Sequence, residues 1–275
     1  MAILPSDPTL GQEQAAMLTD ARAKPFERLT APWRALPDFL VIGAQKAGTT
    51  TLHELLLAHP QVAMSRHKEY NVLTRSNATR LGYRAYFPYR ASLRRSGARR
   101  VGEATPYYLF HTLAPTRAAE WLAGVRAVAV LRDPVERAWS HYRHSVRLGV
   151  EPLDFEAALK AEAERLKAGE GESSRRHSYV ARGRYAEQLE RWFAAIGREN
   201  VLVLGFGEVV RRPEIGLPKL SAFLDIDDRF PRVVPKVNRG VDLGGMPETM
   251  RRWLDAEFSE PNARLARLLG ALPDW

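Results

Sequence analysis

The sequence predicts an α/β fold in which a parallel β-sheet is flanked by helices. Three short apolar runs carry this prediction: residues 39–42, 127–131 and 201–204. Each run ends at a glycine or at an Arg-Asp-Pro turn, and helical periodicity follows, as is typical of β-α units. No internal repeat is visible. We therefore expect residues 37–275 to form a single domain and the proline-rich residues 1–36 to form an N-terminal arm.

The composition limits the classes of function. The chain has 275 residues, is 45% hydrophobic and lacks cysteine, which excludes disulfides and cysteine-ligated metal. No apolar run approaches the roughly 18 residues of a membrane span. The N-terminus does not resemble a signal peptide, so we expect a cytoplasmic protein. The net charge is +9, but the arginines are scattered among glutamates, which fits a local pocket for a small anion as well as a nucleic-acid surface.

The turn after the first strand has the layout of a phosphate-binding loop. It begins at Gly43, and Gly48 leads into an amphipathic helix with a leucine-rich face. A glycine turn at a helix N-terminus presents backbone N–H groups and the positive end of the helix dipole to an anion. The glycines have Walker A spacing, but Thr49 occupies the lysine position and the lysine stands earlier, at Lys46. The loop therefore predicts an anion site without an arrangement for nucleotide-bound Mg²⁺.

The stretch GAQKAGTTTL, residues 43–52, resembles the 5′-phosphosulfate loop of sulfotransferases that use 3′-phosphoadenosine-5′-phosphosulfate (PAPS). The resemblance is to bacterial-type members related to heparan and other carbohydrate sulfotransferase domains, and it implies the P-loop-like sulfotransferase fold. It also implies that the donor's phosphosulfate is bound by six consecutive residues: Lys46, Ala47, Gly48, Thr49, Thr50 and Thr51. Lys46 is then also catalytic, because it stabilises charge on the transferring group and on the leaving adenosine 3′,5′-bisphosphate.

A second motif follows the predicted strand over 127–131. The run RDPVERAWS, residues 132–140, resembles the family's 3′-phosphate site, Arg-(Asp/Asn)-Pro-x-x-Arg-x-x-Ser. The resemblance implies that Arg132 and Ser140 bind the 3′-phosphate, with Arg137 as the internal arginine. The two motifs occur in the family's order, about ninety residues apart.

Residues 65–70, SRHKEY, follow another short strand predicted over 61–64. They stand at the carboxyl edge of the predicted sheet, where open α/β proteins bind ligands. The family has a Lys-Glu pair here, which implies that Glu69 is the general base toward the acceptor and that Lys68 lies beside the substrate. The next residues, NVL, replace the family's His-Phe-Phe. His67 is the second candidate for the base.

Three further segments resemble the family less closely. GEATP, residues 102–106, resembles a segment that lines the acceptor, although heparan-type members have lysine where Ala104 stands. The resemblance implies substrate-binding roles for Glu103 and Thr105. It implies further site residues in an Arg-Gly-x-Tyr run: Arg182, Gly183 and Tyr185. It also implies that three residues close over the donor's 3′-phosphate and adenine: Lys236, Arg239 and Gly240.

The rest of the chain predicts packing elements. Residues 154–168 and 183–196 have helical periodicity, and two helices are expected at 248–258 and 262–269. The polar run at 169–176 predicts a flexible loop, either a lid over the acceptor or a solvated insertion.

The resemblance implies in-line transfer of a sulfuryl group from PAPS to a hydroxyl or amine of a carbohydrate or small-molecule acceptor, without a metal. Two alternatives stay open. A P-loop nucleotide kinase using ATP and Mg²⁺ lacks support from Thr49 at the Walker lysine position. A non-catalytic protein that binds nucleic acid or another polyanion lacks a basic-aromatic platform in this sequence.

Overall fold

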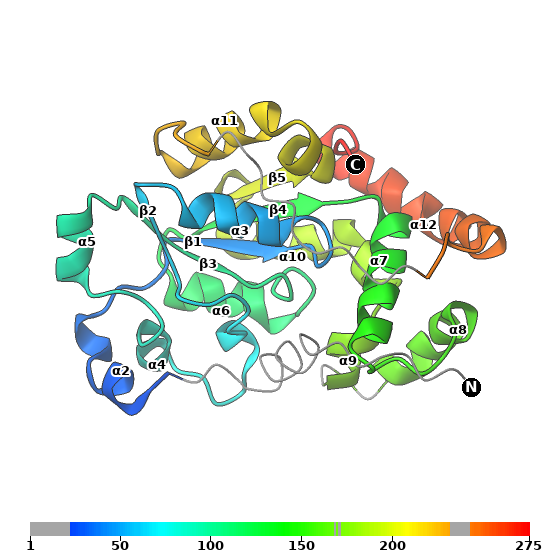
Figure 1. The fold of residues 1–275 in the computed structure, drawn as a ribbon, viewed down its shortest axis with the longest axis horizontal. Coiled ribbons are helices and arrows are strands. Elements are labelled where there is room, and N and C mark those ends of the chain that lie inside the picture. The colour runs from blue at the N-terminus through cyan, green and yellow to red at the C-terminus, as the bar shows by residue number, and fades with distance from the viewer. Residues whose placement is uncertain (1–22, 168, 170–171, 232–242) are drawn as a thin grey trace.

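Figure 1 shows the computed structural model, which describes residues 23–167, 169, 172–231 and 243–275. A five-stranded sheet lies at its centre, in the order β2-β3-β1-β4-β5, and every pairing is parallel. The strands are β1 (Phe39–Gly43), β2 (Val62–Met64), β3 (Arg100–Ala104), β4 (Arg126–Leu131) and β5 (Val201–Gly205). The predicted fold class is confirmed.

The strand order determines where loops gather. From β1 the chain runs to β2 and β3 on one side of the sheet, whereas β4 leads to β5 on the other side. The direction of winding therefore reverses between β1 and β4, and such a switch point leaves a crevice at the carboxyl ends of the two strands. A hydrogen bond of 2.7 Å from the Ala44 N–H to the Val130 carbonyl joins the two strand ends.

Helices cover both faces of the sheet (Figure 1). On one face α3 (Thr49–Leu57) and α11 (Pro213–Leu224) pack over Phe39 and Val41. On the other face α6 (Leu113–Trp121) and α10 (Tyr185–Ile196) pack over Leu40 and Ile42. Successive strand residues point to opposite faces, and both faces are buried. This is why the strands appear in the sequence as uninterrupted apolar runs.

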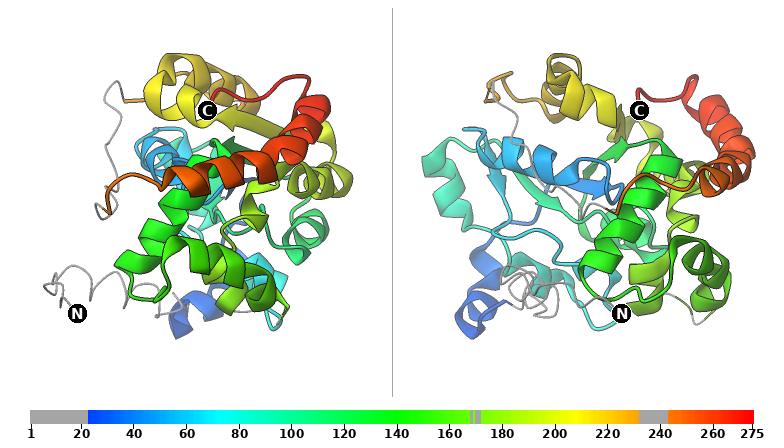
Figure 2. Two further views of the ribbon diagram at one scale, coloured as in Figure 1. Left: turned by 90° about the vertical axis from the view of Figure 1, so that its right-hand side faces the viewer. Right: turned by 45° about the vertical axis from the view of Figure 1, so that its right-hand side comes forward.

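A third layer lies beyond the carboxyl ends of the strands (Figure 2). It contains α7 (Pro134–Arg147), α8 (Phe155–Leu166), α9 (Glu172–His177) and the first half of α12 (Glu248–Leu269). Its own apolar cluster includes Trp139, Phe155 and Phe258. This cluster holds α7 across the end of β1, where Figure 1 shows it.

Shorter elements complete the described part of the chain. Three short helices are α2 (Pro25–Leu29), α4 (Arg80–Arg84) and α5 (Arg90–Ser96). Single turns are η1 (Ala31–Trp33), η2 (Val72–Thr74), η3 (Ala181–Gly183), η4 (Arg198–Asn200) and η5 (Gly207–Arg211). Among the described residues no helix has the length and apolar character needed to span a membrane. Residues 1–22, most of the predicted arm, lie outside the described residues, and the remainder packs through the buried Ala31 and Arg34.

Two predicted elements differ from the structure. The polar run predicted as a loop contains helix α9, whose last turn is basic and so suits the negative end of the helix dipole. The two predicted C-terminal helices are one helix, α12, with Pro261 inside it. Leu254, Phe258 and Leu265 keep one buried side on both flanks of the proline. This packing outweighs the cost of a helical proline.

After α12 the chain returns to the middle of the molecule. The Asp274 carbonyl accepts a hydrogen bond of 2.9 Å from the Gly207 N–H, and the Asp274 carboxylate pairs with Arg212 at 2.5 Å. A Cβ on Gly205 would lie 2.1 Å from the Asp274 carbonyl oxygen. Residues 274–275 therefore lie directly against the turn that follows β5.

Candidate active site

The loop after β1 turns sharply into α3. Gly48 has φ 86° and directly precedes the helix, a left-handed conformation that glycine adopts without steric cost. A Cβ at Gly48 would also lie 2.8 Å from Val210 and 3.3 Å from Phe206. Both the conformation and the close packing therefore require glycine here. The N–H groups of the first turn of α3, residues 49–51, have no partner within the helix and are available to a ligand.

Lys46 lies in this loop within a group of positive charges. The charges of Arg147, Arg132 and Lys68 act on its ammonium, and the carboxylate of Glu69 opposes them. Burial and then the charge of Arg147 lower the pKa of Lys46 from 10.5 to about 8. A bound anion reverses this effect, because it favours the charged form of the lysine.

Arg132 follows β4 and lies against the loop. Its guanidinium donates to the Lys46 carbonyl at 3.3 Å, approaches Glu136 at 3.6 Å and stacks 5.0 Å above the ring of Phe206. Its own carbonyl accepts a hydrogen bond of 2.8 Å from the hydroxyl of the buried Tyr185. These contacts fix the guanidinium beside the loop, where burial lowers its pKa. The structure thus brings Arg132 and Lys46 together.

Helix α7 directs one face toward the same place. The Asp133 side chain caps the helix by accepting from the Glu136 N–H at 2.9 Å. Ser140 is one turn beyond Glu136 and is half-buried on the same face. Arg147, two further turns along, donates to the His144 ring at 3.3 Å. Burial and then the charge of Lys46 lower the pKa of His144 to about 3, so this imidazole is neutral at pH 7.

Residues 65–70 leave the sheet as a bulge. The Ser65 N–H donates to Gly102 at 2.7 Å and the Glu69 N–H donates to Ala104 at 2.9 Å. Two steps along β3 span roughly 7 Å, but the chain opposite them uses four residues, so the residues between must loop outward. Glu69 ends the bulge with φ 59°, and its side chain is exposed.

The bulge is connected to the loop after β1. Lys68 donates to the Thr50 hydroxyl at 2.7 Å, so it lies on the loop side and not toward an open acceptor site. Burial lowers the pKa of Lys68. The negative charge of Glu69 acts on the pKa of both lysines in the opposite direction, because it favours the ammonium form, but the pKa of each lysine stays lowered overall. The two predicted catalytic residues, Lys46 and Glu69, are therefore brought together.

Glu103 and Thr105, predicted to contact the acceptor, are in the interior. Both side chains are 0% exposed. The Glu103 carboxylate accepts from Thr105 at 2.6 Å, from Tyr108 at 2.9 Å and from Tyr83. Burial raises the pKa of this carboxyl. The network supports β3 from inside and leaves neither side chain a surface on which to bind an acceptor.

The internal arginine of the second motif is also structural. Arg137 is fully buried and donates to the Tyr179 carbonyl. Gly183 has no room for a side chain, since a Cβ would lie 2.5 Å from Phe258. Lys236, Arg239 and Gly240 lie outside the described residues, so their predicted roles stay predictions.

Arg182 contacts the loop after β1 through Gln45. It is 3% exposed, donates to the Gln45 side chain, and stacks 4.7 Å over the ring of Tyr107. Burial lowers its pKa to about 9. Arg182 therefore acts on the site through Gln45.

The pattern of the sulfotransferase domain family matches residues 36–238. The chain belongs to this family. The solved structure of a sulfotransferase from Alicyclobacillus acidocaldarius is 30% identical, with a TM-score of 0.70 over 86% of this chain and 97% of that one. Mouse sulfotransferase SULT7A1, solved in complex with PAP, is 17% identical with a TM-score of 0.52, covers 98% of both chains, and shows the likeness of fold alone.

A bifunctional heparan sulfate N-deacetylase/N-sulfotransferase of Caenorhabditis elegans is 25% identical over 88% of this sulfotransferase. The chain spans only 31% of the length of that relative. The family and fold predictions are confirmed, and the comparisons favour neither the kinase nor the nucleic-acid alternative. In the described parts of this sulfotransferase, no group of three His, Asp or Glu side chains is arranged to bind a metal.

Two neighbours of the loop and one residue within it were not predicted to belong to the site. Arg147 could have been found by helical periodicity, because it lies seven residues beyond Ser140 on α7. Phe206 directly follows β5. Because β5 pairs with β4 in the sheet, the residue after β5 lies beside the residue after β4, which is Arg132. Gln45 had no sequence signal, because only the fold places Arg182 beneath it.

Proposed function

We propose that this sulfotransferase transfers the sulfuryl group of PAPS to a hydroxyl or amine of a carbohydrate or small-molecule acceptor. The position of Lys46 carries the proposal. Its side chain is half-buried, and the charges of Arg132, Lys68 and Arg147 act on its ammonium, opposed by Glu69. Clustered buried charges of one sign cost free energy unless an opposite charge balances them. The phosphates and sulfate of PAPS supply that balance.

The residues on the crevice suit the two ends of such a donor. The free N–H groups at the start of α3, with Lys46 and Thr50, match a phosphosulfate. Arg132, with its fork of donors, and Ser140 match a second phosphate. The donor supplies an activated sulfuryl group, and positive side chains and amides supply the charge that stabilises sulfuryl transfer.

Catalysis in this proposal divides between two residues. Glu69 accepts the proton that the acceptor oxygen or nitrogen loses as it bonds to sulfur. Lys46 stabilises the negative charge that the bridging oxygen gains as the bond between that oxygen and sulfur breaks. Lys68 holds the bulge that carries Glu69 against Thr50. This contact connects Glu69 to the loop after β1.

The acceptor class rests on relatives. The curated relatives include enzymes named for heparan sulfate, a carbohydrate. This supports a carbohydrate hydroxyl or amine as the first acceptor to test.

The proposal is tested by thermal unfolding with adenosine 3′,5′-bisphosphate, ADP, and ATP with and without Mg²⁺. A ligand that binds only the folded state raises the melting temperature. We expect stabilisation by the bisphosphate, independent of Mg²⁺, and its loss in Arg132→Ala. Arg251→Ala is the matched control, because Arg251 also pairs with Glu136, at 2.7 Å, but belongs to α12. Stabilisation by ATP with Mg²⁺ and none by the bisphosphate would contradict the proposal.

A further inference from the structure

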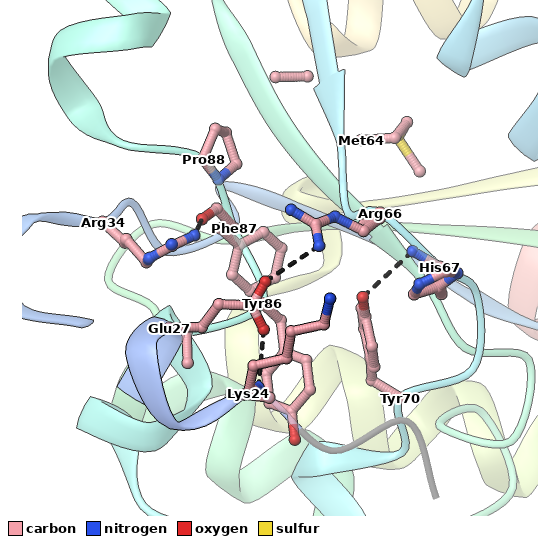
Figure 3. Close-up of a pocket in the computed structure, with 13 residues that line it drawn as sticks. Lys24, Glu27, Arg34, Met64, Arg66, His67, Tyr70, Tyr86, Phe87 and Pro88 are labelled. Atoms are coloured by element: carbon pink, nitrogen blue, oxygen red, sulfur yellow. Dashed lines mark hydrogen bonds and ion pairs between the residues drawn. The ribbon is translucent and has the colours of Figure 1, made fainter. Parts of the chain in front are cut away.

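A pocket of about 370 Å³ lies beside the bulge that carries Glu69 (Figure 3). Arg66, His67 and Tyr70 of the bulge line it, while the intervening Lys68 contacts Thr50 of the donor loop. The bulge therefore lies between the donor loop and the pocket. One side faces Lys46 and the other faces the pocket.

The deep part of the pocket is apolar and aromatic. Tyr70 is 4% exposed, and the ring of Tyr86 lies 4.2 Å from the ring of Tyr70. The buried Met64 and Phe87 also line this part. Tyr70 and Phe87 are buried, so the half-buried ring of Tyr86 supplies the accessible aromatic surface, against which another ring, either aromatic or sugar, can pack.

The rim of the pocket is basic. Among the described residues, the exposed Lys24 and Arg66 line it together with the carboxylate of Glu27, and the buried Arg34 also lines the pocket. Glu27 pairs with Arg66 at 3.1 Å, and Arg34 donates to the Phe87 carbonyl at 2.9 Å. Figure 3 shows the Lys24 ammonium directed into the space between Glu27 and Tyr70. The rim thus has more positive than negative charge, and the side chain of Lys24 is exposed.

Two further guanidinium groups lie next to Arg34. Arg84 and Arg90 both donate to the Arg34 carbonyl, at 2.6 and 3.3 Å. Backbone carbonyls carry no net charge, so these contacts do not neutralise the arginines. Neither side chain lines the pocket, but their charges add to the positive potential around Arg34, which favours anions.

Two internal hydrogen bonds hold the bulge together. The Ser65 hydroxyl donates to the His67 carbonyl at 2.9 Å, and the His67 N–H donates to the Tyr70 hydroxyl at 3.2 Å. Tyr70 and Glu69 are consecutive, so their Cα atoms are about 3.8 Å apart. Glu69 does not line the pocket, but a molecule that fills the pocket and extends past Tyr70 reaches the residue expected to be the base.

We propose that this pocket binds a ring carrying an anionic group, a carboxylate or a sulfate ester, which forms the part of the acceptor remote from the reacting hydroxyl or amine. An acidic sugar and an aromatic acid share this chemistry. Binding of the ring anion stands on the pocket itself, whereas its role as part of the acceptor rests on the proposed function.

The test measures binding of two charged probes and their uncharged analogues to the full chain. The probes are methyl β-D-glucuronide against methyl β-D-glucoside, and 4-methoxybenzoate against 4-methoxybenzyl alcohol. We expect at least one charged probe to bind roughly tenfold tighter than its analogue, as a charge-assisted hydrogen bond provides. The glucuronide arm and the benzoate arm distinguish the two sources.

Substitutions of residues that line the pocket test whether the probe binds there. Lys24→Glu and Arg66→Gln should each weaken binding of the charged probe, the first by roughly tenfold. Arg28→Glu is the matched control for Lys24→Glu, because it changes the net charge by the same amount. Arg28 is exposed on α2 and does not line the pocket. Thermal unfolding of each variant checks that the fold is intact.

Equal binding of charged and uncharged probes overturns the proposal, as does an equal effect of Arg28→Glu and Lys24→Glu. Stabilisation by adenosine 3′,5′-bisphosphate is measured on the same samples. If the bisphosphate binds and the charged probes do not, this inference fails and the proposed function stands. If the charged probes bind in the pocket and the bisphosphate does not, the pocket stands and the proposed function fails.

Discussion

Lys46 and Glu69 share an unusual backbone conformation. Their φ angles are 68° and 59°, in the left-handed region that costs a residue other than glycine about 1 kcal/mol or more. Asn71, two residues beyond Glu69, has φ 54°. Such strain persists where surrounding contacts fix it, and it gathers at functional sites. Here it occurs at the two residues expected to be catalytic.

The lowered pKa of Lys46 leads to a prediction about pH. Below about 8 the ammonium is charged and attracts the bisphosphate, and above about 8 it becomes neutral. We expect the affinity for adenosine 3′,5′-bisphosphate to fall as pH rises from 8 to 10, approaching tenfold per unit. Because the bound anion raises the pKa of Lys46, binding near pH 8.5 should take up a proton. Calorimetry in buffers of different ionisation enthalpy measures this uptake.

Lys46→Arg is the control for that prediction, since a guanidinium stays charged throughout this range. The variant should show neither the fall in affinity nor the proton uptake. A wild-type affinity independent of pH between 7 and 10 would contradict the assignment of Lys46.

Glu69 carries a separate prediction. Glu69→Gln keeps the size of the side chain but cannot accept a proton, so turnover should fall by about 10²–10⁴-fold. Affinity for the bisphosphate should stay within a fewfold, whereas Lys46→Ala should lose both turnover and affinity. The comparison uses single-turnover sulfuryl transfer and thermal unfolding. Near wild-type turnover in Glu69→Gln would shift attention to His67, the exposed neighbour on the same bulge.

At the scale of elements, the buried carboxylate of Glu103 joins α4 to β3. Tyr83 on α4 donates to Glu103 on β3, and both side chains are fully buried. Tyr83→Phe removes one donor from this fully buried network, and should lower the free energy of unfolding by about 1–2 kcal/mol. Tyr86→Phe is the control, because its half-buried hydroxyl contacts Arg75 only at 3.4 Å. Denaturant unfolding of the two variants gives the comparison. Equal losses would show that the network does not stabilise the fold.

The sequence predicted the elements whose signal is local. β1, β4 and β5 are continuous apolar runs, and Asp133 and Pro134 mark the start of α7 because capping depends on adjacent residues. The interior position of Glu103 could not be predicted. It depends on Tyr83 and Tyr108, which converge on the carboxylate only after β3 is in the sheet. The pocket is equally non-local, since α2, β2 and the chain after α4 all contribute to it.

At the scale of the whole molecule, the last residues of the chain support the crevice. Asp274 packs against Gly205 and Gly207, and Phe206 between them stacks under Arg132. The carboxyl end of β5, beside the proposed donor site, is therefore stabilised by a segment about 140 residues from Arg132 in sequence.

This arrangement predicts an effect of Gly205→Ala. The added Cβ would lie 2.1 Å from the Asp274 backbone, so the tail must move, at a cost of about 1–3 kcal/mol in the free energy of unfolding. Affinity for the bisphosphate should fall as well, because Phe206 moves with the turn. Gly245→Ala, where a Cβ meets nothing within 4 Å, should change neither quantity. Thermal unfolding with and without the bisphosphate tests both expectations. Unchanged affinity in a destabilised Gly205→Ala would separate the tail from the crevice.

The position of the last residues also allows ligand binding in the crevice to be followed by tryptophan fluorescence. The indole of Trp275 lies 6.3 Å from the ring of Tyr185, whose hydroxyl bonds to the carbonyl of Arg132. Indole emission responds to nearby charge, and the chain has six tryptophans, so subtracting the spectrum of Trp275→Phe isolates the emission of this one. The protein thus carries an intrinsic fluorophore two contacts away from the residue expected to hold the donor, and occupancy can be followed in real time without a label.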